Sequence, residues 1–181
     1  MTVIILIVIL VILILWVISS QRKLVVLDEN VNNAMSQIGV QLSSRWDALT
    51  ALSDLTKAYA QHEYQTISDT IKMRSAITQK SSAADVNQQE NVFTEAMGKI
   101  MAVAESYPEL KANETYLKTM DSVNQYEETV RKARLVYNDT VTKLNRAIRM
   151  FPTSIAAAML QISKRDYLEA DVKKAEMPDM N

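Results

Sequence analysis

The first twenty residues form an almost unbroken apolar run. No charged side chain occurs in residues 1–21, and Arg22 is the first. A helix of about 20 residues spans roughly 30 Å, which matches the hydrocarbon core of a bilayer. Trp16 lies near the end of the run, and Arg22 and Lys23 follow it, as is typical of a membrane interface. The pattern predicts a transmembrane anchor at residues 1–21, with these three residues at the interface.

The residues that flank this run indicate whether it is cleaved and how it is oriented in the membrane. A cleaved signal peptide has basic residues before its apolar run and a small-residue cleavage site after it. Neither is present, and the chain has no lipobox cysteine, which favours a permanent anchor. Because Arg22 and Lys23 follow the span and no basic residue precedes it, the positive-inside rule predicts that the remaining chain is cytoplasmic.

Beyond the anchor, apolar residues recur at alternating steps of four and three, as on a helix packed along other helices. The stripe consists of Val31, Met35, Ile38, Leu42, Leu49, Leu52, Thr56, Tyr59, Met73 and Ile77. It predicts one long helix from Leu24 to about Lys80. Gly39 lies inside this helix, where a glycine costs about 1 kcal/mol relative to alanine. Gly39 marks a kink or a close approach by another helix, or it is simply tolerated.

The chain after Lys80 predicts a second and a third long helix. Residues 81–85 break the first stripe, and Asp85 with Gln88 resembles a capping box at a helix start. Pro108 disfavours helix at the residue before it and so ends the second helix. Asn113 is a favourable N-cap for the third helix, which continues to the Phe-Pro pair at 151–152.

A short apolar helix follows at residues 154–160, for which Thr153 is the expected cap. The predicted fold class is therefore all-α: an N-terminal transmembrane helix followed by an antiparallel bundle of three long helices and one short helix. The predicted bundle domain comprises residues 24–165, and residues 166–181 form a polar C-terminal tail.

Composition supports this class and excludes several functions. Two glycines and three prolines are too few for the turns of a strand-rich fold. A net charge of −1 argues against nucleic acid as a partner, which usually requires a basic face. The absence of cysteine excludes disulfides, thiolate catalysis and cysteine-based zinc sites.

The lengths of the predicted helices do not match. The first helix, about 57 residues beyond the membrane, would span roughly 85 Å, whereas the second, about 20 residues, would span roughly 30 Å. The part of the first helix nearest the membrane must therefore meet the C-terminal segment, lipid or another subunit. This mismatch points to a homo-oligomer.

Charged residues fall on the inward faces of the predicted helices. The register places Arg45 and Glu63 inside on the first helix, and Glu127 and Arg134 inside on the third. Buried charges are costly unless they are paired. These side chains either extend to the edge of a narrow bundle or form polar layers that fix the helix register. If the first and third helices run parallel, helical rise pairs Arg74 with Glu127.

The chain contains no recognisable catalytic or metal-binding constellation. His62 is the only histidine and is followed by Glu63, but a zinc helix of the H-E-x-x-H type needs histidine where Thr66 stands. A di-metal bundle needs two Glu-x-x-His motifs. The sequence predicts no catalytic residue, no cofactor and no metal. His62 is interpreted as a helix-surface residue, with catalysis and pH sensing as alternatives.

Several segments carry a family resemblance over nearly all of the chain after Leu24. The stretches "AESYPELKAN" and "ARLVYND" are the most distinctive, with "YAQHE" and "MFPTSI" in the same order. Together they resemble the LemA family of bacterial membrane proteins. The resemblance implies a single anchor, a helical bundle, the bacterial inner (cell) membrane and no established enzymatic activity. A basic doublet that the pattern often carries is interrupted here by Ser44.

The family's motif positions carried onto this chain are Arg45, Asp47, His62, Glu63, Arg74, Glu105, Tyr107, Pro108, Lys111, Glu127, Arg134, Tyr137, Asn138 and Pro152. Most of these are interpreted as architectural. Joined with the inward charges, they give a predicted structural polar layer of Arg45, Asp47, Glu63, Arg74, Glu127 and Arg134.

The functional hypothesis is a non-enzymatic helical scaffold that self-associates and organises the membrane or partner proteins. Its expected partners are the lipid bilayer, further copies of the chain and a membrane protein. The alternative is a regulatory adaptor that passes a signal to a membrane-associated enzyme or protease. An enzyme is the third hypothesis, which stoichiometric bound metal would favour.

Overall fold

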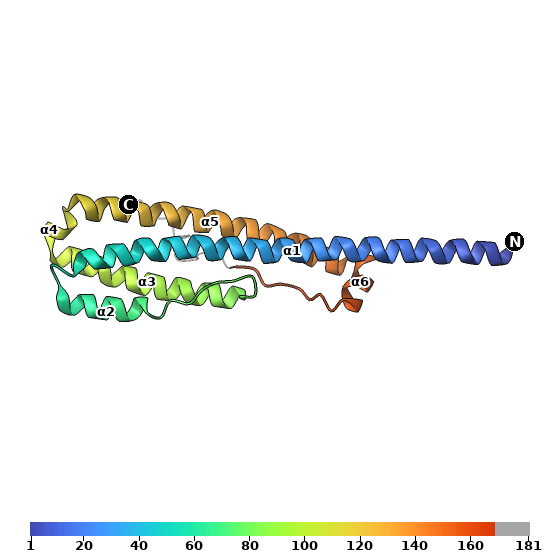
Figure 1. Ribbon diagram of the computed structural model, residues 1–181, viewed down its shortest axis with the longest axis horizontal. Helices are drawn as coiled ribbons and strands as arrows, with labels where there is room; N and C mark the ends of the chain where they lie inside the picture. The colour runs from blue at the N-terminus through green and yellow to red at the C-terminus, as the bar shows by residue number, and fades with distance from the viewer. Residues whose placement is uncertain (169–181) are drawn as a thin grey trace, which may run out of the picture.

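Helix α1 (Thr2–Thr56) runs without interruption from the apolar N-terminal run into the centre of a helical bundle. The computed structural model describes residues 1–168, and these residues form helices and connecting loops with no strand (Figure 1). The other helices are α2 (Gln61–Ile71), α3 (Ala83–Ser106), α4 (Pro108–Lys111), α5 (Glu114–Arg149) and α6 (Thr153–Met159). The predicted all-α fold, with its long helix at the N-terminus, is confirmed.

The central position of α1 sets the arrangement of the other helices. Helix α5 packs along α1 in the opposite direction, while α2 and α3 lie on the other side of α1 (Figure 1). Helix α6 folds back against α1 near the anchor. Helix α5 therefore buries its apolar stripe largely against α1, whereas α3 packs against both α2 and α1.

Buried side chains form three clusters along the rod. The distal cluster, farthest from the anchor, is built around Trp46, Leu49, Phe93, Ile100 and Val123. The middle cluster contains Ile38, Val86, Val130, Val141 and Leu144. The membrane-proximal cluster contains Leu24, Ala147, Ala156 and Ala157. As residue numbers fall along α1, those of its α5 partners rise, as antiparallel packing requires.

The first helix ends earlier than its stripe predicts. It stops at Thr56 instead of continuing to Lys80, and α2 then runs back beside it. Two buried residues explain the reversal, because Ala60 and Ile67 join the distal cluster only if the chain turns back. Residues 72–82 form a loop over α1, so Met73 and Ile77 do not extend the stripe of α1.

The caps also differ from the predicted ones in two places. At α3 the N-cap is Ser82, whose hydroxyl accepts a hydrogen bond from the Asp85 N–H (3.2 Å), while the Ser82 N–H donates to Asp85 Oδ2 (2.7 Å). This capping box lies one turn before the predicted Asp85–Gln88 pair. The predicted Asn113 cap is confirmed, since its side chain accepts from the N–H groups of Thr115 and Tyr116.

At α6, Thr153 does not act as the predicted cap. Its hydroxyl donates back to the carbonyl oxygens of Ala147 (2.6 Å) and Met150 (2.9 Å) at the end of α5. The residue thus fastens the α5–α6 turn instead of satisfying the N–H groups of α6.

The C-terminal segment covers part of α1 and α5 in extended form. Asn138 exchanges two hydrogen bonds of 2.9 Å with the backbone of Leu168, and Asn145 does the same with Arg165. Leu168 is buried in the middle cluster. The boundary of the predicted polar tail, residue 166, falls inside this packed segment, and residues 169–181 of that tail lie outside the described residues.

The start of α1 has the length and composition of a membrane span. Its most apolar 18-residue window has a mean hydropathy of 3.4 and no buried residue. Among the described residues, α1 is the one helix that meets these criteria. Side chains from Val3 to Leu15 project into open space, where a bilayer would remove them from water.

Candidate functional site

Arg45 lies at the centre of a polar layer that joins three helices. This α1 residue is only 5% exposed. Its Nη1 donates to both carboxylate oxygens of Glu90 on α3, at 3.1 and 2.8 Å. Its Nη2 lies 3.6 Å from Glu127 Oε2 on α5. Because one guanidinium engages carboxylates from two other helices, it fixes their relative register.

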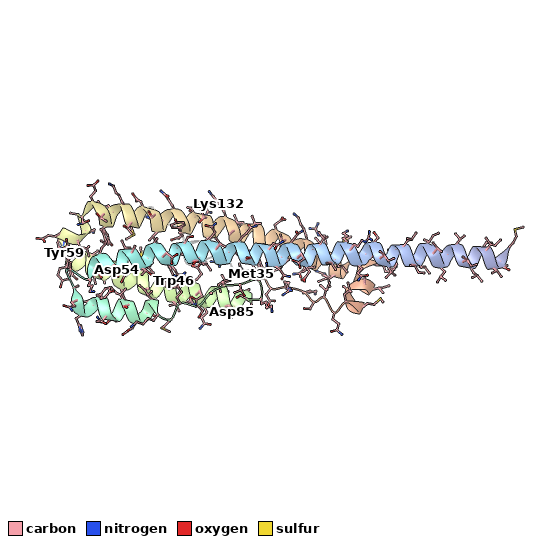
Figure 2. All side chains as sticks on the ribbon, viewed as in Figure 1. Met35, Trp46, Asp54, Tyr59, Asp85 and Lys132 are labelled. Carbon is pink, nitrogen blue, oxygen red and sulfur yellow. The ribbon has the colours of Figure 1, made fainter. Side chains whose placement is uncertain are left out.

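An aromatic pair covers the Arg45 guanidinium. Its central carbon lies 3.6 Å from the centroid of the Phe93 ring, which is within cation–π range. The Trp46 ring meets Phe93 edge-on at 5.2 Å and 77°, and Figure 2 labels Trp46 in the distal part of the bundle, far from the N-terminus. Arg45 Nε is buried without a hydrogen-bond partner in the described part of the chain. The guanidinium charge therefore lies against apolar side chains, and its Nε–H group makes no hydrogen bond within the described residues.

The chemistry of this layer is that of a structural clamp. Arginine remains protonated in proteins, so it supplies no general base. The carboxylates of Glu90 and Glu127 both face the same cation, so they act as its counter-ions. The layer is thus an ion-paired contact among three helices.

A second polar cluster holds the loop of residues 72–82 against α1. Arg74 donates to Asp47 Oδ1 at 2.7 Å and to the Ser43 hydroxyl at 2.6 Å. The buried side chain of Gln89 on α3 accepts a hydrogen bond from the Ser75 N–H at 2.8 Å. The loop is therefore tied to both α1 and α3.

Gly39 allows this loop to lie close to α1. A Cβ atom at Gly39 would overlap the carbonyl oxygen of Ile77. Of the alternatives for Gly39, the structure shows a close approach, but by a loop and not by another helix. A groove of about 560 Å³ lies between the loop and α1, with Ser36, Val40 and Lys80 among its lining residues.

Four residues of the predicted polar layer form two ion pairs. Arg45 meets Glu127, and Asp47 meets Arg74. The predicted pairing of Arg74 with Glu127 is wrong. It assumed that the first and third long helices run parallel, but the additional helix α2 reverses the chain, so α5 is antiparallel to α1.

Glu63 and Arg134 lie apart from these pairs. Glu63 is exposed in the first turn of α2, so its predicted inward position is wrong. The reason is that α2 is a separate helix, which buries Ile67 and Thr70 instead. Arg134 is half-buried on α5, and its Nη2 lies 3.5 Å from Asn87 Oδ1 on α3.

Sequence reasoning missed the strongest partner of Arg45. Glu90 lies three residues before Phe93, an aromatic residue that is buried in the distal cluster. That spacing puts Glu90 on the same face and was a usable signal. The asparagines at 138 and 145 gave no such signal, because their partners are backbone groups of an extended segment.

His62 lies on the surface of α2. It borders a groove of about 330 Å³ between α2 and α3, together with Glu63, Lys99 and Tyr107. Lys99 Nζ is engaged with Thr70 Oγ1 and Glu95 Oε1, each at 2.7 Å. Within residues 1–168, no three histidine or acidic side chains are grouped as a metal site would require.

Two buried tyrosines act as neutral groups. Burial raises the pKa of Tyr116 and of Tyr137 above the ordinary value of a phenol. The Tyr137 hydroxyl donates to the carbonyl oxygen of Asp166 at 3.1 Å. This contact helps to hold the C-terminal segment on α5 and assigns Tyr137 a structural role.

The predicted interface residues lie where the bundle begins to cover α1. Residues 1–15 are exposed, Trp16 and Val17 are half-buried, and Arg22 and Lys23 are exposed. The aromatic and basic residues therefore occupy the boundary between the bare and the covered parts of the helix.

Comparison with known proteins gives partial matches to two curated relatives. Magnetosome protein MamQ 1 and magnetosome protein MamQ 2 of Paramagnetospirillum magneticum are each 29% identical to this chain over 77 residues. That stretch is 42% of this chain but only 28% of each relative. With the exposed apolar helix, these similarities indicate a membrane-anchored helical protein.

The family comparison covers far more of the chain. The model of the LemA family matches residues 34–181, which include most of α1 after the anchor and all the later helices. The polar layer around Arg45 and the segments that resembled this family all lie within the match. This chain therefore belongs to the LemA family.

Proposed function

We propose that this membrane-anchored bundle is a non-enzymatic scaffold that self-associates and organises the membrane or partner proteins. The observation that carries the proposal is the continuity of α1, which is both the candidate span and the central helix of the bundle. From Arg22 to Thr56 the helix extends roughly 50 Å, at 1.5 Å per residue. Such a rod holds its surfaces at fixed heights above the bilayer.

The outer face of α5 offers a surface for self-association. Leu117, Leu135 and Val136 are 50%, 62% and 51% exposed. Leu117 and Leu135 are about five helical turns apart and therefore share one face. Exposed leucines on a polar helix favour contact with another protein surface. The names of the two magnetosome relatives are compatible with a role in an assembly.

Light scattering after size exclusion of the full-length protein, with the detergent mass subtracted, tests self-association. We expect an oligomer that Leu135→Arg converts to monomer. Gln65→Arg is the matched control, because Gln65 is exposed on α2, across α1 from α5. A monomer at all concentrations, without a co-purifying partner, contradicts the proposal.

The second candidate is an adaptor for a membrane-associated enzyme or protease. The groove between α1 and the loop of residues 72–82 favours it, since a partner segment inserted there would displace a loop held by Arg74 and Asp47. Crosslinking in cells separates the candidates. A single crosslinked partner favours the adaptor, whereas ladders of self-crosslinks favour the scaffold.

We place the bundle on the cytoplasmic side of the bacterial inner membrane. The basis is the positive-inside rule applied to Arg22 and Lys23. Protease added to the outside of spheroplasts should leave the bundle intact and digest it only after lysis. Digestion in intact spheroplasts would reverse the orientation.

A further inference from the structure

The turn between α5 and α6 exposes large apolar side chains at one end of the bundle. Residues 149–160, here called the elbow, include four such side chains. They are Met150 (55% exposed), Phe151 (79%), Ile155 (48%) and Met159 (69%). Leaving this much apolar surface in water is unfavourable, so the elbow is a candidate contact surface.

The elbow lies beside the point where α1 leaves the candidate membrane span. Ala156 and Ala157 of α6 pack with Leu24 of α1, and Ser20 is also buried. Figure 1 shows α6 against α1 at the end of the bundle nearest the N-terminus. Because residues 1–15 are exposed and coverage begins at Trp16, the elbow lies at the edge of the predicted bilayer.

Helix α6 has two faces that suit this position. Ala156 and Ala157 are small and allow the helix to approach α1 closely. Ile155 and Met159 are one turn apart on the outside, next to Phe151 in the preceding turn. The hydroxyl of Thr153 donates to two carbonyl oxygens at the end of α5, which fastens the turn. The apolar side chains are thus presented by an ordered segment.

Basic residues surround these apolar side chains. No acidic residue occurs between Thr140 and Arg165, whereas Lys143, Arg146, Arg149, Lys164 and Arg165 lie in that stretch. Arg165 is paired with Asp28 of α1 at 3.0 Å, and Lys143 is paired with Asp139 of α5 at 2.6 Å. Arg22 and Lys23 add two exposed cations at the same level of α1. Apolar side chains flanked by cations are typical of a segment that lies in the interface of an anionic bilayer.

We propose that the elbow is a second membrane contact, which enters the headgroup region of the same bilayer that the N-terminal helix spans. Phe151, Ile155 and Met159 would lie among the upper acyl chains, and Arg149 and Lys164 would face anionic headgroups. The occupant is lipid because the apolar patch adjoins the span itself. The contact would hold the bundle at a fixed rotation about α1, and it does not depend on self-association.

Lipid-attached quenchers test this contact directly in the full-length protein. The chain has no cysteine, so single-cysteine variants take a fluorophore at one chosen site. Phe151→Cys and Met159→Cys report on the elbow. Met101→Cys is the matched control, since Met101 is 48% exposed and apolar but lies on α3 beside the distal cluster, outside the proposed self-association surface. Circular dichroism checks that each labelled variant retains its helicity.

In nanodiscs containing nitroxide-labelled lipid, we expect at least threefold stronger quenching at residues 151 and 159 than at residue 101. Equal quenching at all three positions overturns the proposal. Blue-shifted emission at the elbow without lipid quenching also overturns it, because a protein surface would then cover the patch. The basic rim is tested by omitting anionic lipid, which should weaken quenching at residue 151. Unchanged quenching would reject the role of the cations.

Discussion

The distal and membrane-proximal halves of the bundle stabilise the same helix in different ways. Around Trp46, α1 packs against helices and buries large aromatic side chains and a charged layer. Around Leu24, it packs against the end of α5, the alanines of α6 and an extended segment. Interlocking side chains hold the distal half, whereas hydrogen bonds to the backbone and small residues hold the proximal half.

This difference predicts different responses to damage. A charge layer shared by three helices couples them, so its loss should lower the stability of the whole bundle. An extended segment held by two asparagines can detach while the helices remain folded. The extended segment should therefore open locally, along the middle of the bundle, before the distal half unfolds.

The largest effect is expected for Arg45→Ala, which leaves Glu90 and Glu127 facing each other without their cation. Removing one partner of a buried ion pair costs about 3 kcal/mol or more. Urea unfolding of the full-length protein in detergent, followed by circular dichroism, should show this loss. Adding Glu90→Gln should restore part of it. A loss no larger than that caused by Arg131→Ala, at an exposed pair, would contradict the clamp.

A smaller and local effect is expected for Asn138→Ala. It removes both hydrogen bonds to Leu168 and should cost roughly 1–2 kcal/mol of local stability. Hydrogen exchange should rise for residues 162–168, while the amides of α3 remain protected. Asn124→Ala, at an exposed position on the same helix, is the control. Faster exchange spread evenly over both halves would show that the segment does not open independently.

Alanine substitutions at the two glycines should change the stability of the bundle in opposite directions. Among residues 1–168, and apart from the adjacent residues and backbone of α3 itself, no atom lies within 4 Å of a Cβ placed on Gly98, so Gly98→Ala should stabilise α3 by about 0.5–1 kcal/mol. Gly39→Ala brings its Cβ against the Ile77 carbonyl and should displace the loop. Faster tryptic cleavage at Lys80 and a lower unfolding midpoint would show this. Equal stabilisation by both substitutions would refute the close approach.

The smallest effect concerns pH at the start of α3. Hydrogen bonds from the Ser82 N–H and hydroxyl lower the pKa of Asp85 below its ordinary value of 3.8. The folded state therefore gains stability from Asp85 above about pH 4 and loses it as pH falls through the lowered value. The thermal midpoints of the native chain and Asp85→Asn should differ at pH 7 and converge at acidic pH. Asp121→Asn controls for the loss of one charge, and a constant difference contradicts the linkage.

The parts that the sequence predicted are those with a repeating side-chain pattern. The apolar N-terminal helix, the stripe of α1 up to Thr56 and the Asn113 cap follow from local rules. The structure confirms that these segments are helical and that Asn113 is the N-cap of α5. The reversal after Thr56 did not follow, because Met73 and Ile77 continue the apolar spacing by coincidence. The partners of Arg45 depend on the direction of α5, which that reversal sets. The backbone contacts of Asn138 depend on no spacing at all.

Because α1 is unbroken, the rotation of the anchor about the helix axis is fixed relative to the bundle. Each residue turns a helix by about 100°, so a fixed number of residues fixes which side of the anchor lies below α5. Two chains that meet along α5 must therefore present a defined pair of anchor faces to each other. One inserted residue between Lys23 and Leu24 would turn those faces by about 100° while leaving the bundle intact. In the proposed oligomer, contacts within the membrane and contacts above it therefore depend on each other.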